Sequence, residues 1–333
     1  LNSGNANACT GEEGLANARR MCSLTAEMLG LDAAEVLVCS TGVIGVQLPM
    51  EAIETGIPQA AEVLSGNGGK DAAEAIMTTD TVPKTFAVEV EIAGVKVRIG
   101  GMAKGSGMIA PNMATMLSVI TTDADIAPEL LRKQLGLAVR RSFNCITVDG
   151  DMSTNDTVIV LANGASGAPA IEGSGEAADD FYPGLEMVCR ELARLIARDG
   201  EGATKLVSIR VNGAGNEAEA RQVGLSVANS NLVKTAVFGR DPNWGRILCA
   251  VGYAGVDIDP DKVAVSLCGT PIYGAGAGLD YDKDRLIEAM GAEDIPSRSI
   301  SARGRSTRRF LPAILVMIMC VSTPNTPLEG VCM

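Results

Sequence analysis

Residues 104–117 read Lys-Gly-Ser-Gly-Met-Ile-Ala-Pro-Asn-Met-Ala-Thr-Met-Leu, a glycine-rich segment that ends in an apolar strand pattern. A phosphate-binding loop would carry its lysine after the glycines, directly before a helix. Here Lys104 comes first and no helix signal follows, so we expect no nucleotide site. Two interpretations remain. The segment is a connector with a buried Thr115 that opens a strand, or Thr115 is a nucleophile in a strained loop.

The chain of 333 residues contains no histidine. This excludes Ser-His-Asp and Cys-His activation and histidine-ligated zinc. A hydroxyl nucleophile would then need an amine, a carboxylate or water as its base. Cleavage between Ala114 and Thr115 would free an α-amine with a pKa of roughly 8 beside the Thr115 hydroxyl. One self-cleavage would therefore create both a nucleophile and its base.

Composition indicates an enzyme of small molecules. The net charge of −12 argues against a nucleic-acid partner, which needs clustered basic residues. The nine cysteines include no Cys-x-x-Cys pair, which fits reduced thiols. No signal peptide is visible, and the apolar run 310–321 is too short to span a bilayer. We expect a cytoplasmic protein without a membrane partner. Because the chain begins in an apparent strand end, we also expect it to lack its N-terminal part.

Apolar spacing predicts several helices and strands. Helices are expected over residues 13–30, 49–64, 127–141, 179–199 and 216–229. Alternation over 85–92 and 95–100 predicts a hairpin. Further strands are expected over residues 36–39, 116–121, 145–148, 157–161, 205–211, 246–251 and 262–268. Helices and strands do not alternate strictly, so a layered α+β sandwich is favoured over a Rossmann sheet.

The segment 104–117 resembles the self-processing signature of the ornithine acetyltransferase (glutamate N-acetyltransferase) family. Seven further segments are similar to motifs of this family, and the resemblance runs from residue 1 to about residue 294. They are residues 2–11, 40–45, 78–81, 147–157, 199–205, 232–236 and 241–246. The resemblance implies an α/β/β/α sandwich of the type shared with DmpA-like aminopeptidases. It also implies that residues 78–81 form a substrate-contacting strand.

The resemblance assigns the reaction centre to four residues. Thr115 matches the nucleophile, released by cleavage of the Ala114–Thr115 bond, and it also contacts substrate. Thr41 and Gly42 match the oxyanion hole, in which a hydroxyl and a backbone N–H face the tetrahedral oxygen. The alternative interpretation of residues 40–42 is a simple turn after a strand.

Three more positions match substrate-binding residues of the family. Thr78 and Lys104 are two of them, and Lys104 would hold a substrate carboxylate as a point charge. Glu201 is the third and would meet the substrate amino group. The alternatives are a solvated loop lysine at 104 and an ordinary acid at a helix end at 201.

The resemblance further implies the reaction. Acetyl would pass from N2-acetylornithine to glutamate through acetyl-Thr115 in arginine biosynthesis, without a cofactor or metal. Some family members also accept acetyl-CoA as a co-substrate. The precursor would split into an α-chain portion, residues 1–114, and a β-chain portion that begins at Thr115 and resembles the family to residue 294. Two copies of each chain would form a heterotetramer.

Residues 295–333 do not resemble the family. Five arginines crowd between residues 298 and 309, and an apolar run follows. Codons can be chosen for residues 312–327 that read, in a shifted frame, as the family's usual final strand. We therefore expect a frameshift near residues 295–300, loss of the family's C-terminal substrate residues, and an open sheet edge. These losses would destabilise this chain and impair its transferase activity.

Two other functions remain open from the sequence. A related N-terminal-nucleophile aminopeptidase or amidohydrolase would pass the acyl group to water. An inactive relative would act only as a binding protein. The acidic segment 147–157 lacks the closing glutamate and the spacing of a calcium loop, so we expect no metal there.

Overall fold

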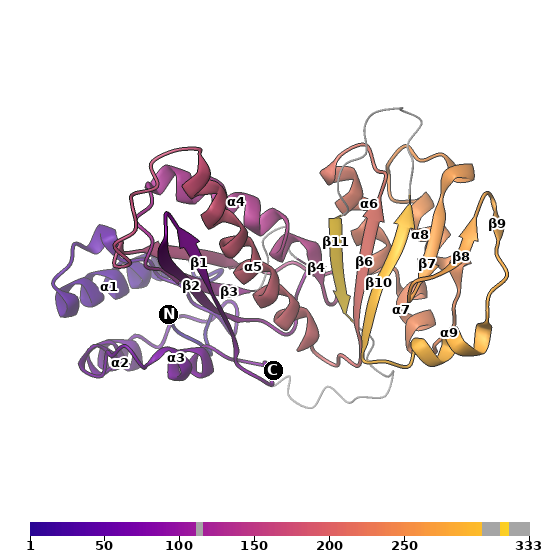
Figure 1. Ribbon diagram of the computed structural model, residues 1–333. Coiled ribbons are helices and arrows are strands. Elements are labelled where there is room, and N and C mark those ends of the chain that lie inside the picture. Colours follow the sequence, from indigo (N-terminus) through magenta and orange to yellow (C-terminus); the bar gives the residue numbers. More distant parts are fainter. Residues whose placement is uncertain (111–115, 302–313, 320–333) are drawn as a thin grey trace. The chain divides into compact units, whose positions relative to one another are not determined.

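The computed structural model describes residues 1–110, 116–301 and 314–319 (Figure 1). These residues form two compact units. Unit 1 takes residues 1–108, 116–136 and 152–192 of the described chain, and unit 2 takes residues 109–110, 137–151, 193–301 and 314–319. Both units combine helices with a sheet, which confirms the expected α+β class.

The sheet of unit 1 has the strand order β1-β2-β3-β5. Its members are β1 (Lys84–Ile92), β2 (Val95–Lys104), β3 (Leu117–Thr122) and β5 (Thr157–Ala162). The expected hairpin of β1 and β2 is confirmed, and it turns at Ala93 and Gly94, whose φ angles of 50° and 79° suit a tight turn. β2 continues past the predicted end at residue 100 and carries Lys104 to the end of the strand.

Residues 176–192 of α5 (Glu176–Arg198) pack on one face of this sheet (Figure 1). A Cβ atom at Gly184 would lie 2.6 Å from Val90 Cγ1 and 2.9 Å from Ile99 Cδ1. The helix therefore approaches the strands closely because position 184 has no side chain. Phe181 and Leu185 on the same helix are fully buried.

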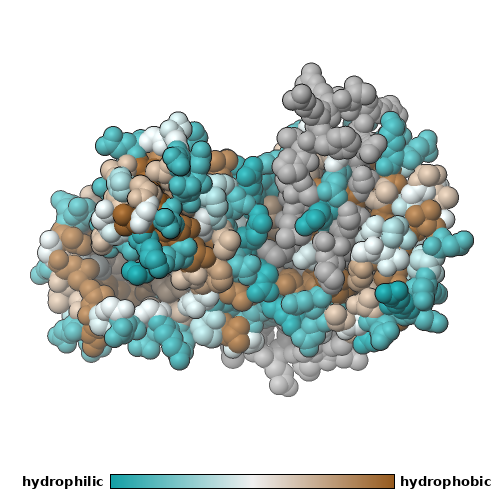
Figure 2. All heavy atoms as spheres, viewed as in Figure 1, coloured by the Kyte–Doolittle hydropathy of each residue, from teal (hydrophilic) through white to brown (hydrophobic). Residues whose placement is uncertain are grey.

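Unit 1 also contains α1 (Gly11–Leu29), η1 (Ala33–Glu35), α2 (Met50–Glu62), α3 (Gly69–Ala75) and most of α4 (Pro128–Arg140). Large apolar side chains are exposed along α1 and after α2, among them Leu29 and Val63, and Figure 2 shows brown patches in this region. Among the described residues, no helix is both long and apolar enough to cross a membrane.

The predicted strand over residues 36–39 is wrong. Instead, isolated bridges join Asn2 to Ser40 and Asn5 to Thr41, so two extended segments run side by side without forming a sheet. This pairing places residues 40–43 against the start of the chain.

The sheet of unit 2 has the order β4-β11-β6-β10-β7-β8-β9. Its strands are β4 (Ile146–Thr147), β6 (Leu206–Asn212), β7 (Ala264–Leu267), β8 (Thr270–Gly274), β9 (Ala277–Gly278), β10 (Asp294–Ser301) and β11 (Ile314–Met319). The expected open edge is wrong, because β11 pairs antiparallel with β6 and parallel with β4. Residues 314–319 are apolar enough to form a strand, and they cover this edge although their sequence does not resemble the family's final strand.

The helices of unit 2 are α6 (Glu217–Asn229), α7 (Asn231–Phe238), α8 (Trp244–Gly252) and α9 (Lys283–Ala289), with the short turns η2 (Phe143–Cys145) and η3 (Pro260–Lys262). The predicted strand over 246–251 is wrong and lies in α8. The Asn243 side chain accepts the Arg246 N–H at 3.1 Å and caps this helix. Ile247, Ala250 and Val251 then share the buried face of the helix. A short apolar run such as this one is compatible with either a buried helix or a buried strand, which explains the wrong prediction.

Candidate active site

The end of β2 brings Lys104 into a cluster of polar side chains in unit 1. Its ammonium donates to Thr78 Oγ1 at 2.7 Å and to Thr41 Oγ1 at 3.5 Å. Lys104 is 3% exposed, whereas Thr78 is exposed. Burial lowers the pKa of Lys104, and the charge of Asp80 partly offsets this effect. The cluster therefore presents a buried cation beside a position that solvent can reach.

The buried Asp80 carboxylate holds this cluster together through several hydrogen bonds. One carboxylate oxygen accepts the Lys84 ammonium at 2.6 Å and the Gly105 N–H at 2.6 Å. The other accepts the Thr78 N–H at 3.1 Å and lies 3.7 Å from Lys104 Nζ. Burial would raise the pKa of Asp80, but the hydrogen bonds from Gly105 and Lys84 outweigh it and hold the pKa below its usual range. An ionised Asp80 thus fixes both elements that carry Thr78 and Lys104.

Thr41 and Gly42 lie on the segment that pairs with the start of the chain. Thr41 is buried, and its N–H donates to the Asn2 carbonyl at 3.1 Å. Gly42 has a φ of 131°, and a Cβ atom there would lie 2.2 Å from the Gly4 carbonyl carbon. Only glycine fits this backbone. The Thr41 hydroxyl is therefore held at a fixed point beside Lys104.

Asp156 lies directly before β5, next to Met116, the residue that precedes β3. Its Oδ1 accepts the Met116 N–H, and the neighbouring Asn155 amide donates to the Ser40 carbonyl. Burial raises the pKa of Asp156 to about 7, while the Met116 N–H and the Lys104 charge partly offset the rise. Asp156 thus belongs to the same cluster as a carboxyl that titrates near neutral pH.

The raised pKa of Asp156 predicts a pH-dependent stability. Between its ordinary pKa near 3.8 and about 7, the folded chain keeps a proton that the unfolded chain has released. Stability due to this group therefore falls as pH rises through that window, by about 1.4 kcal/mol per pH unit at most. We expect Asp156→Asn, measured by urea denaturation, to gain roughly 2–3 kcal/mol relative to wild type between pH 5 and pH 8. An equal difference at both pH values would contradict the raised pKa.

Three of the predicted site residues meet in this cluster: Thr41, Thr78 and Lys104. Residues 78–81 form a bend before β1 and not the expected strand, because Asp80 turns inward to bind Lys84. Ala114 and Thr115 lie outside the described residues, so their roles stay predictions.

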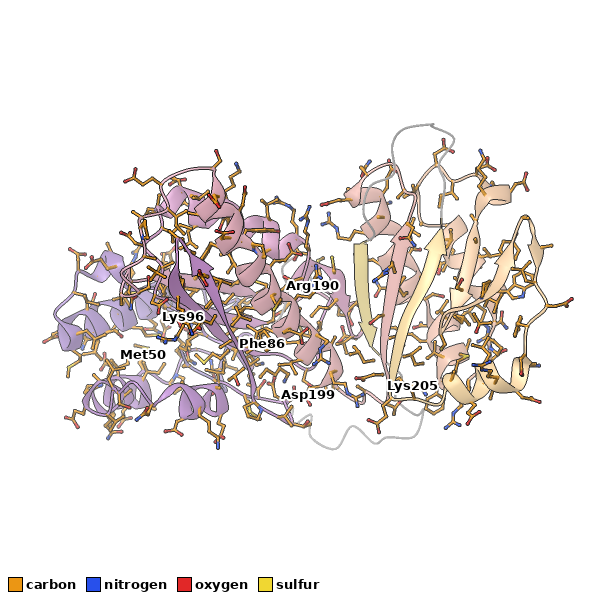
Figure 3. The ribbon with its side chains drawn as sticks, in the orientation of Figure 1. Met50, Phe86, Lys96, Arg190, Asp199 and Lys205 are labelled. Atoms are coloured by element: carbon orange, nitrogen blue, oxygen red, sulfur yellow. The ribbon has the colours of Figure 1, made fainter. Side chains whose placement is uncertain are left out.

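Glu201 belongs to unit 2, where it is exposed in the turn that follows α5. Its binding role stays a prediction. Lys205, four residues later, donates to the carbonyls of Met290 at 2.7 Å and Ala292 at 3.1 Å. This lysine and Asp199, which directly follows α5, are labelled in Figure 3. Lys205 therefore ties β6 to the segment before β10.

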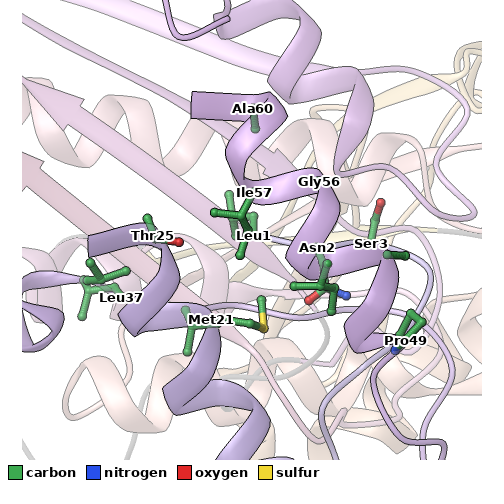
Figure 4. Close-up of a pocket in the computed structure, with 14 residues that line it drawn as sticks. Leu1, Asn2, Ser3, Met21, Thr25, Leu37, Pro49, Gly56, Ile57 and Ala60 are labelled. Carbon is green, nitrogen blue, oxygen red and sulfur yellow. The ribbon is translucent and has the colours of Figure 1, made fainter. Parts of the chain in front are cut away.

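A separate pocket lies between α1 and α2 (Figure 4). Met21 and Thr25 line it from α1, Ile57 and Ala60 from α2, and Leu1 closes one side. Its lining side chains include the hydroxyls of Ser3 and Thr25 but no carboxylate, lysine or arginine to assist them. The cluster around Lys104 is the better candidate for an active site. Within the described part of the chain, no three acidic or cysteine side chains group as metal ligands.

Sequence reasoning missed Asp80 and Lys84 as a pair, and Asp156 as a site residue. Asp80 and Lys84 are two opposite charges in a stretch that leads into an apolar strand, which is the one signal that could have indicated a buried ion pair. Asp156 gives no such signal, because its partner Met116 is 40 residues away.

Comparison with known proteins agrees with the resemblance. The sequence model of the ArgJ family matches residues 1–308. The arginine biosynthesis bifunctional protein ArgJ of Symbiobacterium thermophilum is 54% identical over 294 residues, which are 88% of this chain and 73% of that protein. The protein of the same description from Caldanaerobacter subterraneus subsp. tengcongensis is 55% identical over 267 residues, 80% of this chain and 66% of the relative.

A solved structure supports the same fold. The crystal structure of the arginine biosynthesis bifunctional protein ArgJ from Bacillus halodurans superimposes with a TM-score of 0.59 at 34% identity. The match covers 62% of this chain and 95% of that chain. The expected α+β fold of this family is therefore confirmed.

Proposed function

The chain belongs to the ArgJ family of arginine biosynthesis proteins, and on this premise we propose that it moves acetyl from N2-acetylornithine to glutamate. The carrier is Thr115, after self-cleavage of the Ala114–Thr115 bond. The observation that carries the proposal is the cluster of buried Lys104 and Thr41 with exposed Thr78 in a chain without histidine.

The reaction runs in two halves. The Thr115 hydroxyl gives its proton to its own α-amine and attacks the acetyl carbonyl. Thr41 and the Gly42 N–H stabilise the tetrahedral oxygen, and ornithine leaves. Glutamate then attacks acetyl-Thr115 and departs as N-acetylglutamate. Such acyl transfer uses only side chains and the new amine, so it requires no cofactor or metal.

The substrates are small amino acids, and the cluster suits their charges. The Lys104 ammonium would hold the substrate α-carboxylate, with the exposed Thr78 hydroxyl as a second contact. Glu201 would receive the substrate amino group. The relatives' description as bifunctional supports acetyl-CoA as a second acetyl donor. We further propose a cytoplasmic heterotetramer of two α and two β chains.

Incubation with N2-acetylornithine tests the proposal. With glutamate present, we expect ornithine and N-acetylglutamate in equal amounts. Without glutamate, ornithine release should stop once each Thr115 carries one acetyl group. Acetate released at the same rate with and without glutamate would identify a hydrolase of the aminopeptidase type. An unbroken chain that releases no product would identify a binding protein.

Thr41→Ala tests the oxyanion hole. Loss of one such donor costs roughly 10²–10³-fold in kcat, because the donor acts only on the transition state. We expect this loss in the cleaved enzyme with little change in the KM for N2-acetylornithine. Thr55→Ala is the control, since the Thr55 hydroxyl donates to the Glu51 carbonyl of its own helix and lies on the exposed surface of α2. A raised KM with unchanged kcat would contradict the assigned role.

A further inference from the structure

One buried carboxylate connects the end of β2 with the segment that precedes β1. Asp80 Oδ1 accepts the N–H of Gly105, the residue directly after Lys104, at 2.6 Å. Its Oδ2 accepts the N–H of Thr78 at 3.1 Å. The Asp80 side chain is fully buried, so water does not replace these bonds. The two oxygens therefore fix the backbone at Thr78 and beside Lys104 relative to each other.

The same carboxylate lies between two buried ammonium groups. Lys84 Nζ is 2.6 Å from Oδ1, and Lys104 Nζ is 3.7 Å from Oδ2. Burial lowers the pKa of Lys104, the charge of Asp80 raises it, and the neighbouring Lys84 lowers it again. Asp156 raises this pKa more weakly. Asp80 is thus the group that does most to keep Lys104 a cation, and two ammonium groups against its single charge favour a bound anion.

The cluster meets solvent at Thr78. This residue is exposed, and its Oγ1 accepts the Lys104 ammonium at 2.7 Å. Because the hydroxyl oxygen serves as the acceptor, the hydroxyl hydrogen is still available as a donor. An ammonium and a hydroxyl so close together at a position that solvent reaches match the two oxygens of one carboxylate.

We propose that Asp80 is a positioning residue that holds Thr78 and Lys104 so that the pair takes a substrate α-carboxylate in preference to an uncharged group. The inference rests on the proposed function, in which these two residues contact that carboxylate. Asp80 itself lies behind the pair and acts only through it. Asparagine could not replace it, because an amide offers one acceptor oxygen, whereas Gly105 and Thr78 donate to different oxygens of Asp80.

The preference for ornithine over ornithinamide tests the inference. The two ligands differ only in the α-carboxylate, and neither carries an acetyl group that could react. Their dissociation constants are measured by calorimetry at about pH 6, where Asp156 keeps its proton. Wild type should bind ornithine roughly 10–100-fold more tightly, as expected for hydrogen bonds to a charged group. Asp80→Asn should lose about tenfold or more of this preference.

Asp123→Asn is the matched control. Asp123 also accepts a backbone N–H of β2, that of Arg98 at 2.6 Å, but at the other end of the strand. This variant should keep the wild-type preference. An Asp80→Asn protein that binds both ligands more weakly by the same factor has a structural defect only, and the unchanged ratio would overturn the inference.

A second variant covers the case in which Asp80→Asn does not fold. Asp80→Asn combined with Lys84→Met removes both charges of the buried pair and still lacks the second acceptor oxygen, so the preference should again fall. A wild-type preference in this variant would overturn the inference, as would a wild type that binds both ligands equally. Acetyl transfer from N2-acetylornithine to glutamate is assayed in parallel. Its absence in a wild type that still prefers ornithine would refute the proposed reaction and leave the role of Asp80 in place.

Discussion

Asp80→Ala is expected to destabilise unit 1 by about 3–5 kcal/mol, the typical cost of removing one partner of a buried ion pair. The Lys84 side chain is fully buried, and its ammonium lies 2.6 Å from the Asp80 carboxylate. Alanine would remove the carboxylate that neutralises this ammonium and accepts the Gly105 N–H. Urea denaturation gives the loss as a lower midpoint at unchanged slope.

Glu89→Ala is the matched control for this variant. Glu89 also pairs with a lysine of the hairpin, at 2.7 Å from Lys96 Nζ, but both side chains are exposed. Exposed pairs of this kind contribute about 0–1 kcal/mol. If Asp80→Ala lowered the free energy of unfolding no more than Glu89→Ala does, the stabilising role of the buried Asp80–Lys84 ion pair would be contradicted. Adding Lys84→Met to Asp80→Ala should recover much of the loss, because it removes the buried charge that Asp80 had neutralised.

Thr115→Ala is expected to stay a single chain of 34.4 kDa and to lose acetyl transfer. The methyl side chain has no oxygen to attack either the Ala114 carbonyl or an acetyl donor. Removal of a nucleophile costs roughly 10³-fold or more in kcat. Denaturing gel electrophoresis and the N-acetylglutamate assay measure the two effects. Thr115→Ser keeps a hydroxyl and should yield two chains, which separates loss of chemistry from loss of fold.

Much of the fold could be predicted from the sequence, because local patterns determined it. The alternation of Val and Ile in β1 and β2 predicts the hairpin, and Gly30 correctly ends α1 with a φ of 68°. The prediction of a strand over residues 246–251 was wrong because this apolar run is compatible with both a strand and a buried helix. The signal that favours the helix is the N-cap residue Asn243, which lies before the apolar run and outside the predicted strand.

The candidate site also contains residues that the sequence predicted and residues that it did not. Thr41, Thr78 and Lys104 follow from the family resemblance, and the structure brings them together. The roles of the two aspartates come from contacts between distant segments, 25 residues from Asp80 to Gly105 and 40 from Asp156 to Met116. Burial favours a higher pKa for both carboxyls, and the hydrogen bonds from Gly105 and Lys84 bring the pKa of Asp80 below its usual range. Both effects depend on the packed fold and leave no mark in the sequence.

Intact mass spectrometry of the purified protein, before and after exposure to N2-acetylornithine, tests the central claim most directly. The account predicts two polypeptides, one that ends at Ala114 and one that begins at Thr115, with a single acetyl group on the second after exposure. One uncut polypeptide that still converts N2-acetylornithine and glutamate to products would contradict it.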